Sequence, residues 1–194
     1  MTFDFKNKYF LNNGKKYEIV FLEDIDCSDM KLIKNHRRYR DKYKVHNHYR
    51  NVYFDKKENL YYKIWEKEYI HNVSFTNAML NNLYDNDLIL PLKSLIFDKE
   101  YICRGYITHG GEVVEKNICD LHKLFEIYKK NIIRTNCVIS IPKSDNIIKY
   151  NDNYTLIDYD IVYPINILKE KDLDKKFNWC TCKKYSNFFK SIYK

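Results

Sequence analysis

The sequence predicts an α+β protein, and three observations indicate this class. Short runs rich in Tyr, Ile and Leu alternate with polar turns in the first part of the chain, as in strands. Leu121, Leu124, Phe125, Tyr128 and Ile132 then recur along one stripe, which is typical of an amphipathic helix. The 194 residues are 45% hydrophobic and 31% charged, so the chain is long enough and apolar enough to fold into one domain or two small lobes.

The predicted elements before the helix are mostly strands. The run Leu60 to Trp65 pairs as a hairpin with Asn51 to Asp55 around the polar turn between them. Strand alternation places Lys63 on one face together with Tyr61 and Trp65. Lys63 is therefore a cation within an aromatic strand. The other expected elements are strands at 17–22, 92–97 and 101–107, helices at 66–84 and 121–132, and short helices within 169–194.

A second hairpin is expected near the end of the chain. Ile147 to Tyr150 and Tyr154 to Asp158 are strand-like runs, and the residues between them, Asn151-Asp152-Asn153, tolerate left-handed backbone conformations. Asn146 precedes the first run and Asp158 ends the second. Paired strands of this length would bring an amide oxygen and a carboxylate together, which suits Mg²⁺ bound with a phosphate.

This stretch resembles the hairpin between the catalytic loop and the metal loop of protein kinases. Lys143, Asn146 and the run Leu156-Ile157-Asp158-Tyr159 match that pattern in order, and the strand Leu60-Tyr61-Tyr62-Lys63 matches a second kinase motif. The order of the expected elements over 17–160 agrees. The resemblance implies a small two-lobed protein-kinase-like fold with a five-stranded antiparallel N-lobe sheet at 1–107 and a reduced helical C-lobe at 108–194.

The resemblance also implies ATP and Mg²⁺ as cofactors and assigns roles to residues of this chain. Lys63 would hold the α- and β-phosphates. Tyr106 and Thr108 would lie at the hinge beside adenine. The expected metal ligands are Asn146 and Asp158, and Lys143 would neutralise the transferred phosphate. Asp145 is the second expected catalytic residue, chosen for its place in the sequence and not by a match to the family.

The sequence departs from the kinase pattern at several points. Ile141 occupies the position of the catalytic aspartate, and isoleucine cannot accept a proton from a substrate hydroxyl. Asp145 and Asp160 lie near enough in sequence to substitute for it, but outside the family's register. The segment Lys31 to Arg50 stands where a glycine-rich loop is expected and contains no glycine. These departures leave both an active kinase and a nucleotide-binding pseudokinase as interpretations.

Charge and composition leave other partners open. The formal net charge of +8 attracts phosphates, nucleic acid or acidic partners. The basic segment Lys31 to Arg50 therefore supports a nucleic-acid-binding module as an alternative, and a non-catalytic adaptor that binds a protein substrate or partner is a third hypothesis. His46-x-His48 and Cys180-x-Cys182 are too few ligands to define a metal site. With no apolar leader or membrane-length apolar segment, we expect a soluble cytoplasmic protein with reduced thiols and no membrane partner.

Overall fold

The computed structural model describes residues 2–36, 39–40, 45–46, 50–65, 89–112, 118–135, 137–139, 147–157 and 162–164. The chain divides into two compact units, which are described separately. The first comprises Met1–Val73 and Leu90–Gly111, and the second comprises Ser74–Ile89 and Glu112–Lys194. The domain boundary expected after residue 107 stays a prediction.

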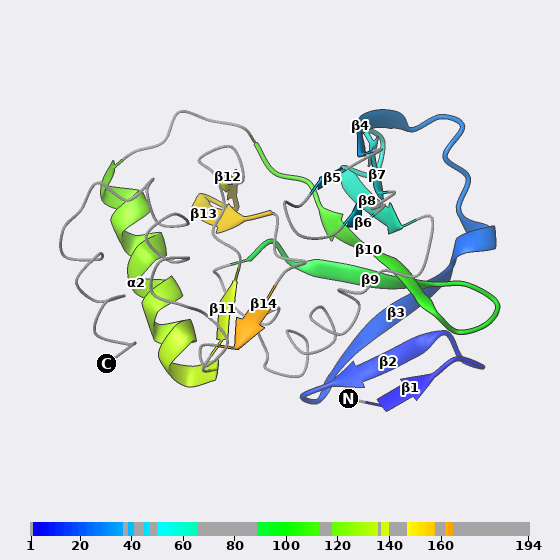
Figure 1. Ribbon diagram of the computed structural model, residues 1–194, viewed down its shortest axis with the longest axis horizontal. Helices are drawn as coiled ribbons and strands as arrows, with labels where there is room; N and C mark the ends of the chain where they lie inside the picture. Colours follow the sequence, from blue (N-terminus) through cyan, green and yellow to red (C-terminus); the bar gives the residue numbers. More distant parts are fainter. Residues whose placement is uncertain are drawn as a thin grey trace. The chain divides into compact units, whose positions relative to one another are not determined.

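The first unit contains an eight-stranded sheet in the order β1-β2-β3-β9-β10-β8-β7-β4 (Figure 1). Most neighbouring strands are antiparallel, but β3 and β9 run parallel, so the sheet is mixed. The strands are β1 Thr2–Asp4, β2 Tyr9–Asn12, β3 Lys15–Phe21, β4 Lys31–His36, β7 Arg50–Asp55, β8 Leu60–Trp65, β9 Leu92–Phe97 and β10 Cys103–His109. A separate strand pair, β5 Tyr39–Arg40 with β6 Val45–His46, lies in the same unit.

The predicted fold class is wrong in its architecture. The described part of the chain is mostly β, with a mixed sheet of eight strands in place of a five-stranded antiparallel one. It contains one α-helix, α2 Ile118–Thr135, where a helical lobe was expected. The sheet is larger because the N-terminal residues add β1 and β2 beyond β3, and Lys31–His36 adds β4 beyond β7. β3 itself pairs in parallel with β9. The helices expected at 66–84 and 169–194 lie outside the described residues.

Aromatic packing explains how the N-terminal strands join the sheet. The ring of Phe3 lies 5.5 Å from those of Phe10 and Phe97, and Phe5 lies 5.1 Å from Phe97, measured between ring centroids. Phe10 is fully buried. Aromatic pairs at these distances stabilise beyond the area that they bury. These contacts attach β1 and β2 to the end of β9.

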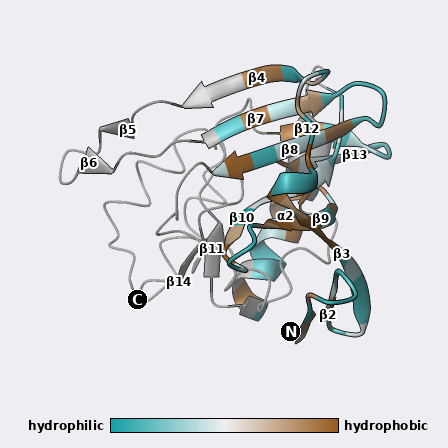
Figure 2. Ribbon diagram, turned by 90° about the vertical axis from the view of Figure 1, so that its right-hand side faces the viewer, coloured by the Kyte–Doolittle hydropathy of each residue, from teal (hydrophilic) through white to brown (hydrophobic). Residues whose placement is uncertain are grey.

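The two faces of β8 separate as the alternation predicted. Leu60 and Ile64 are buried in a cluster with Ile96 and Ile107, and Tyr62 packs against it. Figure 2 shows hydrophobic and hydrophilic residues changing along β7 and β8. Successive residues of a strand point to opposite faces, so this cluster lies on the face away from Lys63. The predicted hairpin of 51–55 with 60–65 is confirmed, since β7 and β8 pair from Arg50 opposite Trp65 to Asp55 opposite Leu60.

The second unit contains α2 and two strand pairs. Leu124, Phe125 and Tyr128 are buried along α2, which confirms the helix predicted from the apolar stripe. β12 Ile147–Tyr150 pairs with β13 Asn153–Leu156, and β11 Cys137–Ile139 pairs with β14 Val162–Pro164. The tight hairpin expected around Asn151 and Asp152 is confirmed. In the described residues, no helix is long and apolar enough to cross a membrane.

The hairpin turn gives a first testable prediction. Asn151 and Asp152 have φ values of +46° and +61°, a left-handed conformation in which a glycine is favoured at the second position. We expect Asp152→Gly to raise the free energy of unfolding by about 0.5–1 kcal/mol, measured by urea denaturation. Asn153→Gly, one residue further on in β13, is the matched control and should lower it instead. Asp152→Gly also removes an exposed ion pair of 3.0 Å with Lys149, which contributes little because water screens it. A loss of stability greater than about 1 kcal/mol would therefore contradict the strain at this turn.

Candidate functional site

Lys63 is a buried lysine on an inner strand of the sheet. β8 lies between β7 and β10, and the side chain of Lys63 is only 8% exposed. Its Nζ donates a hydrogen bond of 2.7 Å to the hydroxyl of Tyr106. The same Nζ lies 5.1 Å from the centroid of the Tyr106 ring. The contact follows from register, because Tyr106 of β10 is the direct cross-strand partner of Lys63.

The arrangement fixes a positive charge in one place. Burying an ammonium group is costly unless polar groups replace its water, and Tyr106 contributes a hydroxyl that accepts a hydrogen bond from it. An ammonium held in this way loses little further freedom when it binds an anion. The Lys63 ammonium is therefore held by a specific partner on β10.

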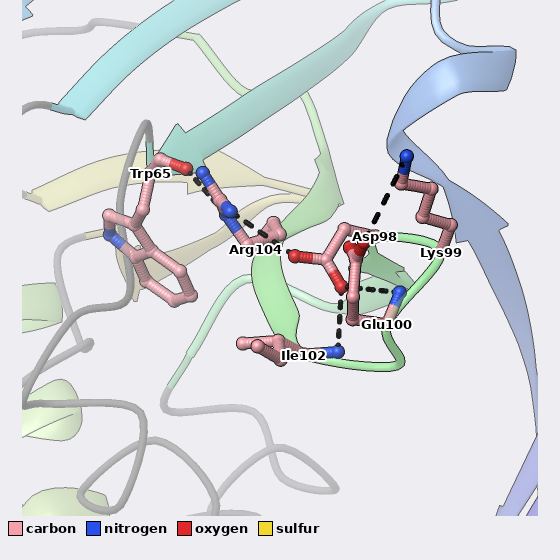
Figure 3. Close-up of polar contacts among 6 residues, drawn as sticks. All are labelled: Trp65, Asp98, Lys99, Glu100, Ile102 and Arg104. Atoms are coloured by element: carbon pink, nitrogen blue, oxygen red, sulfur yellow. Dashed lines mark hydrogen bonds and ion pairs between the residues drawn. The ribbon is translucent and has the colours of Figure 1, made fainter.

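Two neighbouring side chains position this pair. The Trp65 ring, 1% exposed, contacts the Tyr106 ring edge-on, with 6.0 Å between centroids. Arg104 donates from Nε to the Trp65 carbonyl oxygen at 3.0 Å and from Nη1 to Asp98 Oδ2 at 3.2 Å (Figure 3). A continuous set of contacts thus runs from Asp98 through Arg104 and Trp65 to Tyr106 and Lys63.

Asp98 also organises the turn between β9 and β10. Its Oδ1 accepts hydrogen bonds from the backbone N–H groups of Glu100 and Ile102, at 3.1 and 2.9 Å (Figure 3). Aspartate at the start of a turn commonly binds the backbone in this way. Both Asp98 and Arg104 are largely buried. The turn therefore holds Arg104 in reach of the end of β8.

Gly105 brings β8 and β10 close together behind Lys63. A Cβ at this position would lie 2.0 Å from the Lys63 carbonyl oxygen, far inside contact distance. Gly105 has φ +155° and follows an irregularity in the pairing of β10 with β9. Only glycine fits this backbone approach. The register that opposes Tyr106 to Lys63 thus depends on Gly105.

The structure brings together some of the predicted site residues and leaves others untested. Lys63 and Tyr106 are in contact, and Thr108, 5% exposed, lies two residues further along β10 on the Tyr106 side. The four remaining predictions lie outside the described residues and stay predictions: Lys143, Asp145, Asn146 and Asp158. The basic segment 31–50 begins with β4, an edge strand of the sheet, and its role with nucleic acid also stays a prediction.

Sequence reasoning missed Asp98, Arg104 and Gly105 as parts of the site. Asp98 carried a recognisable signal as a turn residue. The alternation of β8 already placed Trp65 on the face of Lys63. Arg104 carried no signal, because its contacts with Asp98 and with the Trp65 carbonyl join residues that lie apart in the sequence.

Thiol and metal chemistry find little support among the residues that the structure describes. Cys27 and Cys103 are thiols and not members of a disulfide, and burial raises the pKa of Cys103 to about 11. The Cys103 thiol is therefore protonated at neutral pH and a poor nucleophile. No group of three or more His, Cys, Asp or Glu side chains in this part of the chain is placed to hold a metal ion.

Comparison with known proteins gives one structural neighbour to report. No protein-family model and no curated protein matches the sequence. Among solved structures, the chain is similar to one described as an apo pseudokinase, with 8% sequence identity and a TM-score of 0.43. The similarity covers 83% of this chain and 68% of that one. The proposal below rests on the geometry around Lys63.

Proposed function

We propose that the chain binds a nucleoside triphosphate with Mg²⁺, in the manner of a pseudokinase. The observation that carries the proposal is the buried ammonium of Lys63, held by Tyr106 on an inner strand of a sheet. Nucleotide-binding proteins need such a fixed cation for the phosphates, and a lysine on a strand provides it. ATP is the ligand to test first.

The other roles in this proposal come from sequence. Lys63 contacts the α- and β-phosphates, and Tyr106 and Thr108 of β10 line the nucleoside side of the site. Asn146 and Asp158 bind the Mg²⁺, because amide and carboxylate oxygens are ligands that this ion accepts.

Binding without phosphoryl transfer is the form of the function that we favour. Ile141, at the position expected for the catalytic base, has no group that accepts a proton. Lys143 and Asp145 are the residues to examine if transfer occurs. Incubation with labelled ATP and a general protein substrate distinguishes the two forms, since a pseudokinase leaves the substrate unlabelled.

A thermal-shift experiment tests nucleotide binding. Mg-ATP at about 100 times its dissociation constant should stabilise the wild-type chain by about 2.7 kcal/mol. Lys63→Met should lose most of this stabilisation, because it removes the cation and keeps an apolar stem of similar length. Lys57→Met is the matched control, since Lys57 is exposed in the turn before β8, and it should respond like the wild type.

Three outcomes would contradict the proposal. The first is a wild-type melting temperature that Mg-ATP leaves unchanged. The second is equal stabilisation of wild type and Lys63→Met. The third is stabilisation by ATP that persists both without Mg²⁺ and in Asp158→Ala. That result would show that ATP binding needs neither the metal ion nor its proposed ligand. Tight oligonucleotide binding that weakens steeply with salt would support the nucleic-acid alternative.

A further inference from the structure

A cavity of about 360 Å³ opens on the face of the sheet that points away from Lys63. Tyr62 lines this cavity, and it neighbours Lys63 in β8, so the two side chains point to opposite faces. The sheet forms one wall, and residues of the segment 24–30 form another. The volume lies in the range of small-molecule sites. The cavity is thus separate from the site proposed for the nucleotide.

A row of four residues in register crosses the cavity wall. Glu18 of β3 lies opposite Ser94 of β9, Ser94 opposite Ile107 of β10, and Ile107 opposite Tyr62 of β8. Ser94 is fully buried and donates a hydrogen bond of 3.2 Å to Glu18 Oε2. This bond holds one carboxylate oxygen of Glu18, an exposed residue that lines the cavity, against the sheet.

Apolar side chains line part of both walls, beside the carboxylates of the segment 24–30. Leu60 is buried, and Val20, Ile25 and Met30 are half-buried around the cavity. These side chains offer contact to the body of a ligand. The half-buried ring of Tyr62 adds an aromatic face, to which a cation is attracted.

The charges around the cavity are opposite in sign to the net charge of the chain. Glu18, Asp24 and Asp26 contribute three carboxylates against the single ammonium of Lys93, whereas the whole chain carries +8. Asp24 is partly offset by an exposed ion pair of 2.8 Å with Lys8. A hydrogen bond from the backbone N–H of Ser28 lowers the pKa of Asp26, which therefore stays ionised at neutral pH. The rim thus favours a positively charged ligand.

We propose that this cavity binds a small organic ammonium ion with an apolar body. The ammonium group lies beside the carboxylates of Glu18 and Asp26, which both line the cavity, and the apolar body lies against Val20, Leu60 and Ile107. Three independent features select this class of ligand: the size of the cavity, its apolar wall and the carboxylate that Ser94 holds in place.

The experiment uses the full chain, labelled with ¹⁵N, and three probes of one shape. Phenethylamine carries the charge, 2-phenylethanol is its neutral analogue, and phenylacetate is the anion. We expect phenethylamine alone to give saturable shifts of the amide signals of Tyr62, Ser94 and Ile107. Equal shifts with 2-phenylethanol, or none with phenethylamine, would overturn the proposal.

Matched variants test the part played by charge. Glu18→Gln keeps the acceptor for Ser94 and removes the charge, so it should weaken phenethylamine binding about tenfold. Asp26→Asn, at an exposed position where the fold is less at risk, should weaken it in the same direction. Glu23→Gln removes an exposed carboxylate that does not line the cavity and should leave the affinity unchanged. If all three variants bound phenethylamine as tightly as the wild type, Glu18 and Asp26 would not be the groups that bind its ammonium.

Discussion

Gly105→Ala should lower the free energy of unfolding by about 3 kcal/mol or more, the largest effect expected of any single methyl group in the sheet. The added Cβ would lie 2.0 Å from the Lys63 carbonyl oxygen and 3.2 Å from the Ile64 Cα. These are backbone atoms of a paired strand, so they cannot rotate away as a side chain can. The strands must separate or slip. Urea denaturation measures the loss, which is large against a typical total of about 5–15 kcal/mol.

Gly14→Ala is the matched control for this substitution. Gly14 also has a positive φ, +77°, but a Cβ there would meet nothing within 4 Å. Its cost should be about 1 kcal/mol, from backbone strain alone. The difference between the two variants therefore isolates the clash behind Lys63. If both variants lost the same stability, β8 and β10 would not approach as closely as the structure shows.

Local patterns were sufficient to predict several elements of the fold. The hairpin at Asn151 and Asp152 depends on residues that accept a positive φ, and α2 depends on an apolar stripe. The two faces of β8 follow from simple alternation. Each of these features is determined by residues close in sequence, so a single sequence contains the necessary information.

The choice of strand partners was not predictable in the same way. β3 was expected to begin a five-stranded antiparallel sheet, but it pairs in parallel with β9, far along the chain. Lys31–His36 was interpreted as a basic segment in place of a loop, yet it pairs with β7 as a strand. Pairing between distant segments depends on which apolar faces meet, and periodicity does not specify this.

The same distinction applies to the candidate site. Alternation placed Lys63 on a face with Trp65, but the partner that holds its ammonium follows from the register of β8 with β10. That register depends on Gly105 and on the turn that Asp98 organises. The sequence therefore indicated Lys63 as the candidate cation, and the structure adds Tyr106 as the residue that holds its ammonium in place.

Asp98→Ala should lower the free energy of unfolding by about 3–5 kcal/mol. The substitution removes the acceptor for two backbone N–H groups, those of Glu100 and Ile102, and the partner of Arg104. The Arg104 side chain is 17% exposed, so its largely buried charge would lose the Asp98 carboxylate, which lies 3.2 Å away. Removing one member of a largely buried ion pair is the larger cost, because the N–H groups of Glu100 and Ile102 belong to exposed residues and can bind water instead. Urea denaturation measures the total.

Two further variants separate these contributions. Glu100→Gln removes the charge from an exposed pair with Lys99, 3.9 Å apart, and should change stability by less than about 0.5 kcal/mol. Arg104→Met should cost less than Asp98→Ala, since the turn keeps its backbone acceptor. In the double variant, the loss should be smaller than the sum of the two single losses, because each removes the same ion pair. Strictly additive losses would show that Asp98 and Arg104 act independently. Asp98 would then not help to hold Arg104 against the Trp65 carbonyl, next to Tyr106 and Lys63.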